Sequence, residues 1–221
     1  MTRKHAFFFI ILALSGSILA CSSSTPPPNL PGLLPYGDRV LEDNFVNNDL
    51  GWDAFNGQEG STGLENEAFK IQVKSHFAEI WANPKSDMII PANVIVEAQA
   101  LNAGSKDNTY GLICRYVDAE NFYFFVISSD GYYGIGKARN GQHNLINRTE
   151  MPPSEAFDGD AMNNLRAECT GSRLAFYVNG TLLDVQNDSD LTQGSVGLIA
   201  GSYAEEVTVY FDNFKVYQPG P

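Results

Sequence analysis

The sequence predicts an all-β protein made of many short antiparallel strands. Its 221 residues include 10 Tyr, 14 Phe and 20 Gly, a composition typical of aromatic strands joined by tight turns. Asp130-Gly131, Asn140-Gly141 and Asn179-Gly180 each lie between two strand-like segments, where they favour tight hairpin turns. No stretch has the spacing of a long amphipathic helix. We therefore expect one all-β domain built from short antiparallel strands around a single core.

The N-terminus has the features of a signal peptide, which we assign to residues 1–20. Arg3 and Lys4 precede a short apolar core that cannot span a bilayer as a mature helix. The segment Ile18-Leu19-Ala20-Cys21 resembles the lipobox of bacterial lipoproteins, in which the cysteine is acylated and becomes the first residue of the mature chain. An ordinary secretory signal peptide that ends before a cysteine is the alternative. The lipobox predicts a lipid-anchored protein on the extracytoplasmic side of a cell membrane or cell envelope.

The rest of the chain divides into a tether and one domain. Residues 21–38 are rich in Ser and Pro and have no periodicity, which predicts an extended, disordered tether. Strand patterns then run over residues 39–217 and leave a tail, 218–221. Because Arg3 and Lys4 leave with the signal peptide, the net charge falls from −12 to about −14, which argues against nucleic acid as a partner.

The expected strands differ in how their apolar residues are spaced. Residues 68–74 alternate apolar and polar side chains, which is typical of a strand with one wet face. Residues 122–127 are apolar at every position, so we expect this strand in the middle of a sheet, covered on both faces. The other expected strands are residues 40–45, 77–81, 93–101, 112–116, 132–139, 142–148, 165–169, 174–178, 195–200 and 207–217, with a loop at 152–160.

Strand parity predicts which residues of 112–116 face the core. Leu112, Cys114 and Tyr116 share one parity, and we place them inside the sandwich. Ile113 and Arg115 then lie on the opposite surface of the sheet.

The same reasoning predicts a disulfide. Cys169 shares its parity with Leu165 and Ala167, which directs it toward the core. If Cys21 is acylated, Cys114 and Cys169 remain as a pair in a compartment that permits oxidation. The bond would close a loop of about 56 residues, which the chain-entropy model values at roughly 4 kcal/mol. Two buried free thiols are the alternative.

Several short segments share a recognisable pattern: residues 111–116 (GLICRY), 121–123 (NFY), Asp130-Gly131, 174–180 (LAFYVNG), Gly197-Leu198 and 211–214 (FDNF). Together they resemble the concanavalin A-like lectin and glucanase superfamily, and within it the laminin-G-like and keto-disaccharide-hydrolase-like branch. The resemblance covers about residues 39–217 and implies a two-sheet antiparallel jelly-roll sandwich. It does not fix the function, because this fold carries lectins, glycosidases and adhesion modules.

The enzymatic branch of the superfamily requires two carboxylates across one cleft. The Glu-x-Asp-x-x-Glu pattern of its laminarinase-type members is absent from the sequence. Glu97 stands without a partner on its strand, and Asp118-Ala119-Glu120 falls on an expected turn. The histidines, His5, His76 and His143, are too scattered to predict a metal or nucleophile site. The sequence therefore favours a non-catalytic module over an enzyme.

Glycan binding would use aromatic and polar side chains, because sugar rings stack on Tyr or Trp and their hydroxyls bond to polar neighbours. The candidates are Arg115, Tyr110, Tyr132, Tyr133, Trp81 and His76. The alternative for each is a structural role, since most aromatic side chains of a sandwich belong to its core.

Similar acidic motifs at the two ends of the domain suggest a calcium site. Residues 42–45 (EDNF) are echoed by residues 211–214 (FDNF). In jelly-roll carbohydrate-binding modules the first and last strands often lie side by side, so the resemblance implies that Asp43 and Asp212 could coordinate a structural Ca²⁺. The alternative, which we favour, is that these residues bond their own backbone in turns. No other cofactor is expected.

These features favour a membrane-anchored extracytoplasmic lipoprotein that carries a non-catalytic glycan-binding or adhesion module. The expected partners are the membrane, through the lipid, and a glycan. A glycan-degrading hydrolase and a structural or protein-interaction domain remain the alternatives.

Overall fold

The computed structural model describes residues 32–85 and 87–221, and all the regular elements in this part of the chain are β-strands. The predicted signal peptide, the predicted lipidation site Cys21 and most of the predicted tether fall outside the described residues. Within them, no helix is long and apolar enough to cross a membrane.

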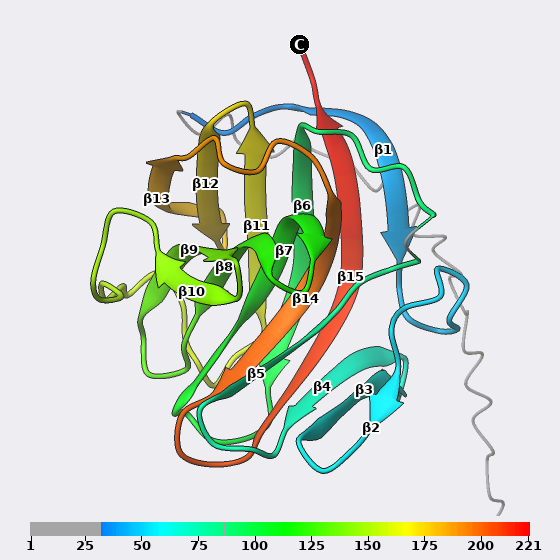
Figure 1. Ribbon diagram of the computed structural model, residues 1–221, viewed down its shortest axis with the longest axis vertical. Coiled ribbons are helices and arrows are strands. Elements are labelled where there is room, and N and C mark those ends of the chain that lie inside the picture. Colours follow the sequence, from blue (N-terminus) through cyan, green and yellow to red (C-terminus); the bar gives the residue numbers. More distant parts are fainter. Residues whose placement is uncertain (1–31, 86) are drawn as a thin grey trace, which may run out of the picture. The chain divides into compact units, whose positions relative to one another are not determined.

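The strands form two antiparallel sheets (Figure 1). The larger sheet contains, in spatial order, β13 (Thr181–Asn187), β12 (Arg173–Val178), β11 (Asn163–Thr170), β6 (Val94–Asn102), β15 (Val207–Pro219), β4 (Ala68–Val73), β3 (Gly60–Glu65) and β2 (Phe55–Asn56), with β1 (Tyr36–Asp43) paired to β15. The smaller sheet contains β10 (Gln142–Leu145), β9 (Tyr133–Arg139), β8 (Asn121–Ile127), β7 (Asn108–Asp118), β14 (Ser195–Ser202) and β5 (Ala78–Ala82). The predicted all-β architecture of two antiparallel sheets is confirmed.

Strand β8 is buried on both faces, as its continuous apolar sequence predicts. Tyr123, Phe125 and Ile127 belong to the main core between the sheets. Phe122 and Phe124 belong to a second, smaller core on the outer face of the smaller sheet. The strand lies inside its sheet between β7 and β9. Aromatic side chains therefore anchor both sides of this sheet.

The predicted disulfide is present and joins the two sheets. Cys114 on β7 is bonded to Cys169 on β11, with their Cα atoms 6.8 Å apart. Both cysteines are fully buried in the main core. The bond crosses the sandwich through its interior.

A bulge in β7 corrects part of the parity prediction. Arg115 has a φ of +51°, and the pairing of β7 shifts register beside it with both β8 and β14. Because a bulge inserts one extra residue, side chains beyond it change faces. Leu112 and Cys114 face the main core as predicted, but Tyr116 packs on the outer face. The predicted positions of Tyr116 and Arg115 were wrong for this reason.

The predicted hairpins all occur, and two have the predicted turn. Both residues of Asn140-Gly141, between β9 and β10, have positive φ angles, as do both residues of Asn179-Gly180, between β12 and β13. In Asp130-Gly131 only Gly131 does. There β8 and β9 are joined by residues 128–132, and the Ser128 N–H donates to the Tyr132 carbonyl at 2.8 Å. The prediction of a two-residue turn at this site was wrong.

The outer face of the larger sheet carries a cluster of charged side chains. Glu168 is fully buried and accepts hydrogen bonds from Arg166 at 2.8 Å and from Arg173 at 2.6 Å. Arg166 also lies 4.5 Å above the ring centre of Tyr36 and donates to Glu97 at 3.2 Å. We call Glu97, Arg166, Glu168 and Arg173 the charged cluster.

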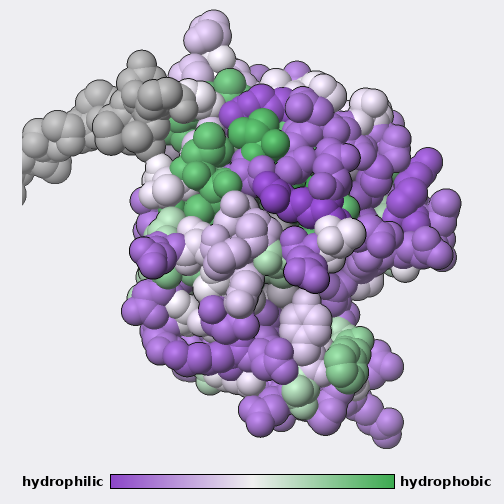
Figure 2. Space-filling view, turned by 90° about the vertical axis from the view of Figure 1, so that its left-hand side faces the viewer, coloured by the Kyte–Doolittle hydropathy of each residue, from purple (hydrophilic) through white to green (hydrophobic). Residues whose placement is uncertain are grey.

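Hydrophilic residues dominate the side of the molecule on which β13 and β10 lie, and apolar residues form separate patches there (Figure 2). On β13, Leu182 and Val185 are among the exposed large apolar residues. A strongly acidic chain with such a surface is well suited to an aqueous environment.

Candidate functional site

Five side chains on the outer face of the smaller sheet form an aromatic cluster, which we call the aromatic face: Trp81, Tyr116, Phe122, Phe124 and His143. Phe122 and Phe124 are its buried floor. Half-buried Trp81 lies 5.3 Å from Phe122 between ring centres, and half-buried His143 lies 5.3 Å from the same ring. Trp81 also donates its indole N–H to the Tyr116 hydroxyl at 3.4 Å. Three partly exposed rings thus line one surface.

The smaller sheet curls around this face. Its strand order places β10 and β5 at opposite edges, yet His143 of β10 is hydrogen-bonded through Nδ1 to the Glu79 carboxylate of β5. Two edge strands can meet in this way only if the sheet bends toward its outer side. The aromatic face is therefore concave.

A hollow next to the His143–Glu79 pair has a volume of about 240 Å³ and is bordered by Thr109 and Tyr203. Burial, together with the charge of Glu79, raises the pKa of Tyr203, so its phenol keeps its proton. Carboxylate, imidazole and phenol groups beside aromatic rings can bond sugar hydroxyls while the rings stack on the apolar side of the sugar.

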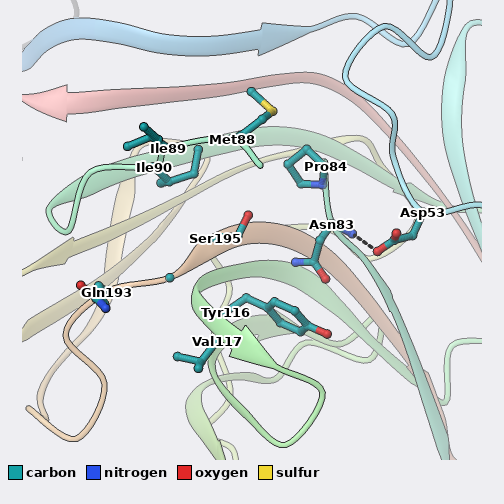
Figure 3. Close-up of a pocket in the computed structure, with 11 residues that line it drawn as sticks. Asp53, Asn83, Pro84, Met88, Ile89, Ile90, Tyr116, Val117, Gln193 and Ser195 are labelled. Atoms are coloured by element: carbon teal, nitrogen blue, oxygen red, sulfur yellow. Dashed lines mark hydrogen bonds between the residues drawn. The ribbon is translucent and has the colours of Figure 1, made fainter. Parts of the chain in front are cut away.

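A larger cavity of about 490 Å³, which we call the end pocket, lies where β5, β7 and β14 meet (Figure 3). Strand ends supply Asn83, Tyr116 and Ser195, and residues 88–90 line it together with residues 193–194. Tyr116 borders both the end pocket and the aromatic face, so the two adjoin.

Arg115 holds two of the segments that form the end pocket. Its Nη1 donates to the carbonyl of Leu191 at 2.8 Å, and its Nε donates to the carbonyl of Ala92 at 3.3 Å. The side chain is only 2% exposed, and burial lowers its pKa. Leu191 precedes residues 193–194, and Ala92 follows residues 88–90, so one guanidinium positions both segments.

Tyr123 and Asp188 add a second anchor for the chain leading into the end pocket. The Leu191 N–H donates to the Tyr123 hydroxyl at 3.1 Å, and that hydroxyl in turn bonds to Asp188. Lys137 forms an ion pair with Asp188 at 2.6 Å. The segment before Ser195 is thus fixed to β8 and β9.

The six predicted ligand-binding residues lie in different places. Trp81 is part of the aromatic face. Arg115 and Tyr110 are buried, so neither side chain is available to a ligand in this structure. Tyr133 packs partly against the main core, while Tyr132 and His76 are exposed and line neither the end pocket nor the hollow beside the His143–Glu79 pair. The structure brings only Trp81 into the concave face.

Sequence reasoning missed Glu79, His143, Asn83 and the outward position of Tyr116. The doubly apolar β8 was a usable signal, because its outer side needed a cover of other rings. The meeting of β10 and β5 left no comparable pattern in the sequence.

The predicted neighbourhood of the first and last strands is confirmed, since Asp43 on β1 pairs with Phe214 on β15. The Asp43 carboxylate accepts hydrogen bonds from the Phe45 N–H at 2.8 Å and from the Trp52 indole at 2.9 Å. Asp212 accepts from the backbone and side chain of Asn213. These contacts match the alternative of acidic residues bonding local donors, and the described residues contain no group of three His, Cys, Asp or Glu that could hold a metal ion. The calcium site stays a prediction.

The sequence matches no protein-family model and no curated protein. Among solved structures, carbohydrate-binding module CBM66 from Bacillus subtilis aligns with a TM-score of 0.61 and 19% identity, over 76% of this chain and 96% of the module. The catalytic domain of an endo-1,3-beta-glucanase from Thermotoga petrophila aligns with a TM-score of 0.57 and 12% identity, over 86% of this chain and 100% of that domain. The Bacillus licheniformis beta-glucanase aligns with a TM-score of 0.58 and 12% identity, over 83% of this chain and 99% of that enzyme chain.

The chain has the concanavalin A-like jelly-roll fold. The fold inferred from the residue resemblance is thereby confirmed. Low identity to these structures means that the likeness describes the jelly roll itself, and the function has to be argued from the site.

Proposed function

We propose that this jelly roll is a lipid-anchored glycan-binding module whose ligand lies in the concave aromatic face. One observation carries the proposal: Trp81, Tyr116 and His143 are partly exposed rings on a concave sheet, next to a carboxylate and a phenol. Rings offer stacking surface for the C–H side of a sugar, and Glu79 and Tyr203 offer partners for its hydroxyls. Solved structures with the same fold include a carbohydrate-binding module and glucanases, which supports this reading.

Truncation of Trp81 tests the proposal. A glycan array with the purified whole chain selects a ligand, and titration calorimetry then compares the parent with Trp81→Ala. We expect affinity to fall about tenfold or more, because a stacking ring is lost. Phe55→Ala is the matched control, since Phe55 is a 43% exposed ring on β2 of the other sheet. An array without any bound glycan, or equal losses in both variants, would refute the proposal.

The proposed anchor is the acyl group on Cys21, which places the jelly roll outside the cytoplasm at a membrane or cell-envelope surface. Its support is the lipobox-like Ile18-Leu19-Ala20-Cys21 and the Ser/Pro-rich segment after it. Mass spectrometry of the native protein should find an acylated N-terminal Cys21. An unmodified N-terminus at another residue would remove the anchor from the proposal.

Hydrolysis is the second candidate, because Glu79 and Glu150 border the same hollow of about 390 Å³. Two carboxylates facing one site are the chemical requirement for glycoside cleavage. The test is release of reducing ends from the array-selected glycan, with Glu79→Gln and Glu150→Gln as variants. Cleavage that either substitution abolishes would replace the binding module with an enzyme.

A further inference from the structure

The end pocket contains buried polar atoms without partners. Within residues 32–85 and 87–221, three buried side-chain N or O atoms lack a hydrogen bond, and two of them, Asn83 Oδ1 and Ser195 Oγ, belong to residues that line this pocket. Buried acceptors normally have partners, so two orphans in one pocket indicate a place for a hydrogen-bond donor.

The Asn83 amide is fixed so that its oxygen stays free. The side chain is 4% exposed, and its Nδ2 donates to the Val196 carbonyl at 2.7 Å. Gly197 makes room for this amide, because a Cβ atom there would lie 2.4 Å from Nδ2. With the nitrogen committed to β14, the oxygen is left to accept, and in Figure 3 the side chain lies beside Ser195 and above the Tyr116 ring.

The opposite part of the pocket is apolar and partly exposed. Ile89, which is 92% exposed, lies beside Ile90, and Val117, which is 55% exposed, lies on another side of the pocket (Figure 3). Asp53 is the one charged residue in the described lining. A pocket with acceptors, an apolar wall and a carboxylate disfavours anionic ligands and favours a neutral ligand that combines donors with an apolar group.

We infer that the end pocket takes a terminal sugar of a neutral glycan that carries a methyl group next to an N–H or O–H donor. Two sugar types share this chemistry: 2-acetamido sugars and 6-deoxy sugars. The donor bonds to Ser195 Oγ or Asn83 Oδ1, and the methyl group packs on Ile89 and Ile90, which lie on the side toward which the Ser195 hydroxyl points (Figure 3). This inference rests on the proposed glycan binding, since Tyr116 connects the pocket to the aromatic face.

Matched sugar pairs test it by titration calorimetry with the whole chain. N-acetylglucosamine is compared with glucose, and 6-deoxygalactose with galactose of the same series. At least one methyl-bearing sugar should bind about tenfold more tightly than its partner, and which pair shows the difference identifies the sugar type. Equal affinity within both pairs would overturn the inference.

Two variants locate the binding in the end pocket. Ser195→Ala removes an unpartnered hydroxyl, so folding should be unchanged while affinity for the preferred sugar falls about fivefold. Ile89→Ser should erase the preference within the pair, whereas Leu182→Ser on β13 of the other sheet should not. If Trp81→Ala abolishes glycan binding but Ser195→Ala and Ile89→Ser change nothing, the inference fails and the proposed function stands. If no glycan binds, both fail.

Discussion

The outer faces of the two sheets differ in how their buried polar groups are hydrogen-bonded. On the larger sheet, the fully buried Glu168 is neutralised by Arg166 and Arg173, and the Tyr36 ring covers Arg166. Polar groups there bond to one another. On the smaller sheet, partly exposed rings border hollows, and two buried polar atoms have no partner. The charged cluster is satisfied by internal contacts, although the buried Thr170 hydroxyl on the same sheet lacks a partner, whereas the end pocket brings two such atoms to one cavity.

The positive charge of Arg166, on the outer face of the larger sheet, is stabilised by the groups around it. Burial alone would lower the pKa of Arg166, but its hydrogen bond to Glu168 and the nearby negative charges raise the pKa overall. Arg166 also donates to the Leu34 carbonyl at 2.5 Å, while the Leu34 N–H donates to Glu168 at 3.0 Å. The charged cluster therefore fixes the start of the domain. We therefore expect the outer face of the larger sheet to contribute to stability, and the proposed recognition to use the smaller sheet.

The largest effect should come from the disulfide, because it joins the sheets that carry the two faces. Replacing both Cys114 and Cys169 by Ala should lower the free energy of unfolding by roughly 4 kcal/mol. Urea denaturation measures the loss, and the same double variant treated with reductant is the control, since it should show no further change. If reduction left the stability of the parent protein unchanged, the disulfide would not have the stabilising role predicted here.

The next largest effect should come from the charged cluster on the outer face of the larger sheet, and it should change stability alone. Glu168→Gln leaves Arg166 and Arg173 without their buried countercharge, so we expect a loss of about 3 kcal/mol in the free energy of unfolding. Glycan affinity, measured well below the melting temperature, should stay unchanged. Glu42→Gln, which alters a surface ion pair with Lys215, should cost less than about 1 kcal/mol. Altered glycan binding in Glu168→Gln would break the division between the two faces.

A substitution of Arg115 should reduce both the stability of the fold and the proposed binding at the end pocket. Lys in its place cannot reach the carbonyls of both Ala92 and Leu191, so the free energy of unfolding should fall by about 2 kcal/mol. Binding at the end pocket should weaken more than binding at Trp81, because both segments around the pocket lose an anchor. Arg139→Lys, at an exposed site on β9, is the matched control. Unchanged affinity for the preferred sugar would show that Arg115 does not position the pocket.

The sequence was sufficient for the sandwich because its signals are local. Alternating strands, Asn-Gly turns and a doubly apolar β8 each follow from backbone and burial requirements within a few residues. The aromatic face was predictable only in part. A positive φ at Arg115 turns Tyr116 to the outer side of the sheet, and no glycine or proline at this position indicates the bulge in the sequence. His143 and Glu79 are brought together only because the whole smaller sheet bends. The Asn83 amide has space only because Gly197, more than 100 residues away, has no side chain. Such contacts depend on tertiary geometry.

The smallest predicted effect is a pH dependence of stability that comes from Asp188, in the segment that leads into the end pocket. Burial alone would raise the pKa of Asp188, but hydrogen bonds from Lys137 and Tyr123 outweigh it and lower the pKa below its ordinary value. Because the folded state favours ionised Asp188, its contribution to stability is present above the carboxyl's unfolded pKa and is lost as the pH falls through the folded pKa. Asp188→Asn should therefore cost about 1 kcal/mol at neutral pH and less as the pH approaches 3.

Urea titrations of parent and variant between pH 3 and pH 7 measure this difference. Asp160→Asn is the control, since Asp160 forms an exposed pair with Lys106 and should show a small cost throughout. If the difference between Asp188→Asn and the parent is constant with pH, the carboxylate is not what ties the segment before Ser195 to the sheet. If the difference shrinks in acid and sugar affinity falls with it, the charge of Asp188 holds the chain that enters the end pocket, and sugar binding at that pocket depends on pH.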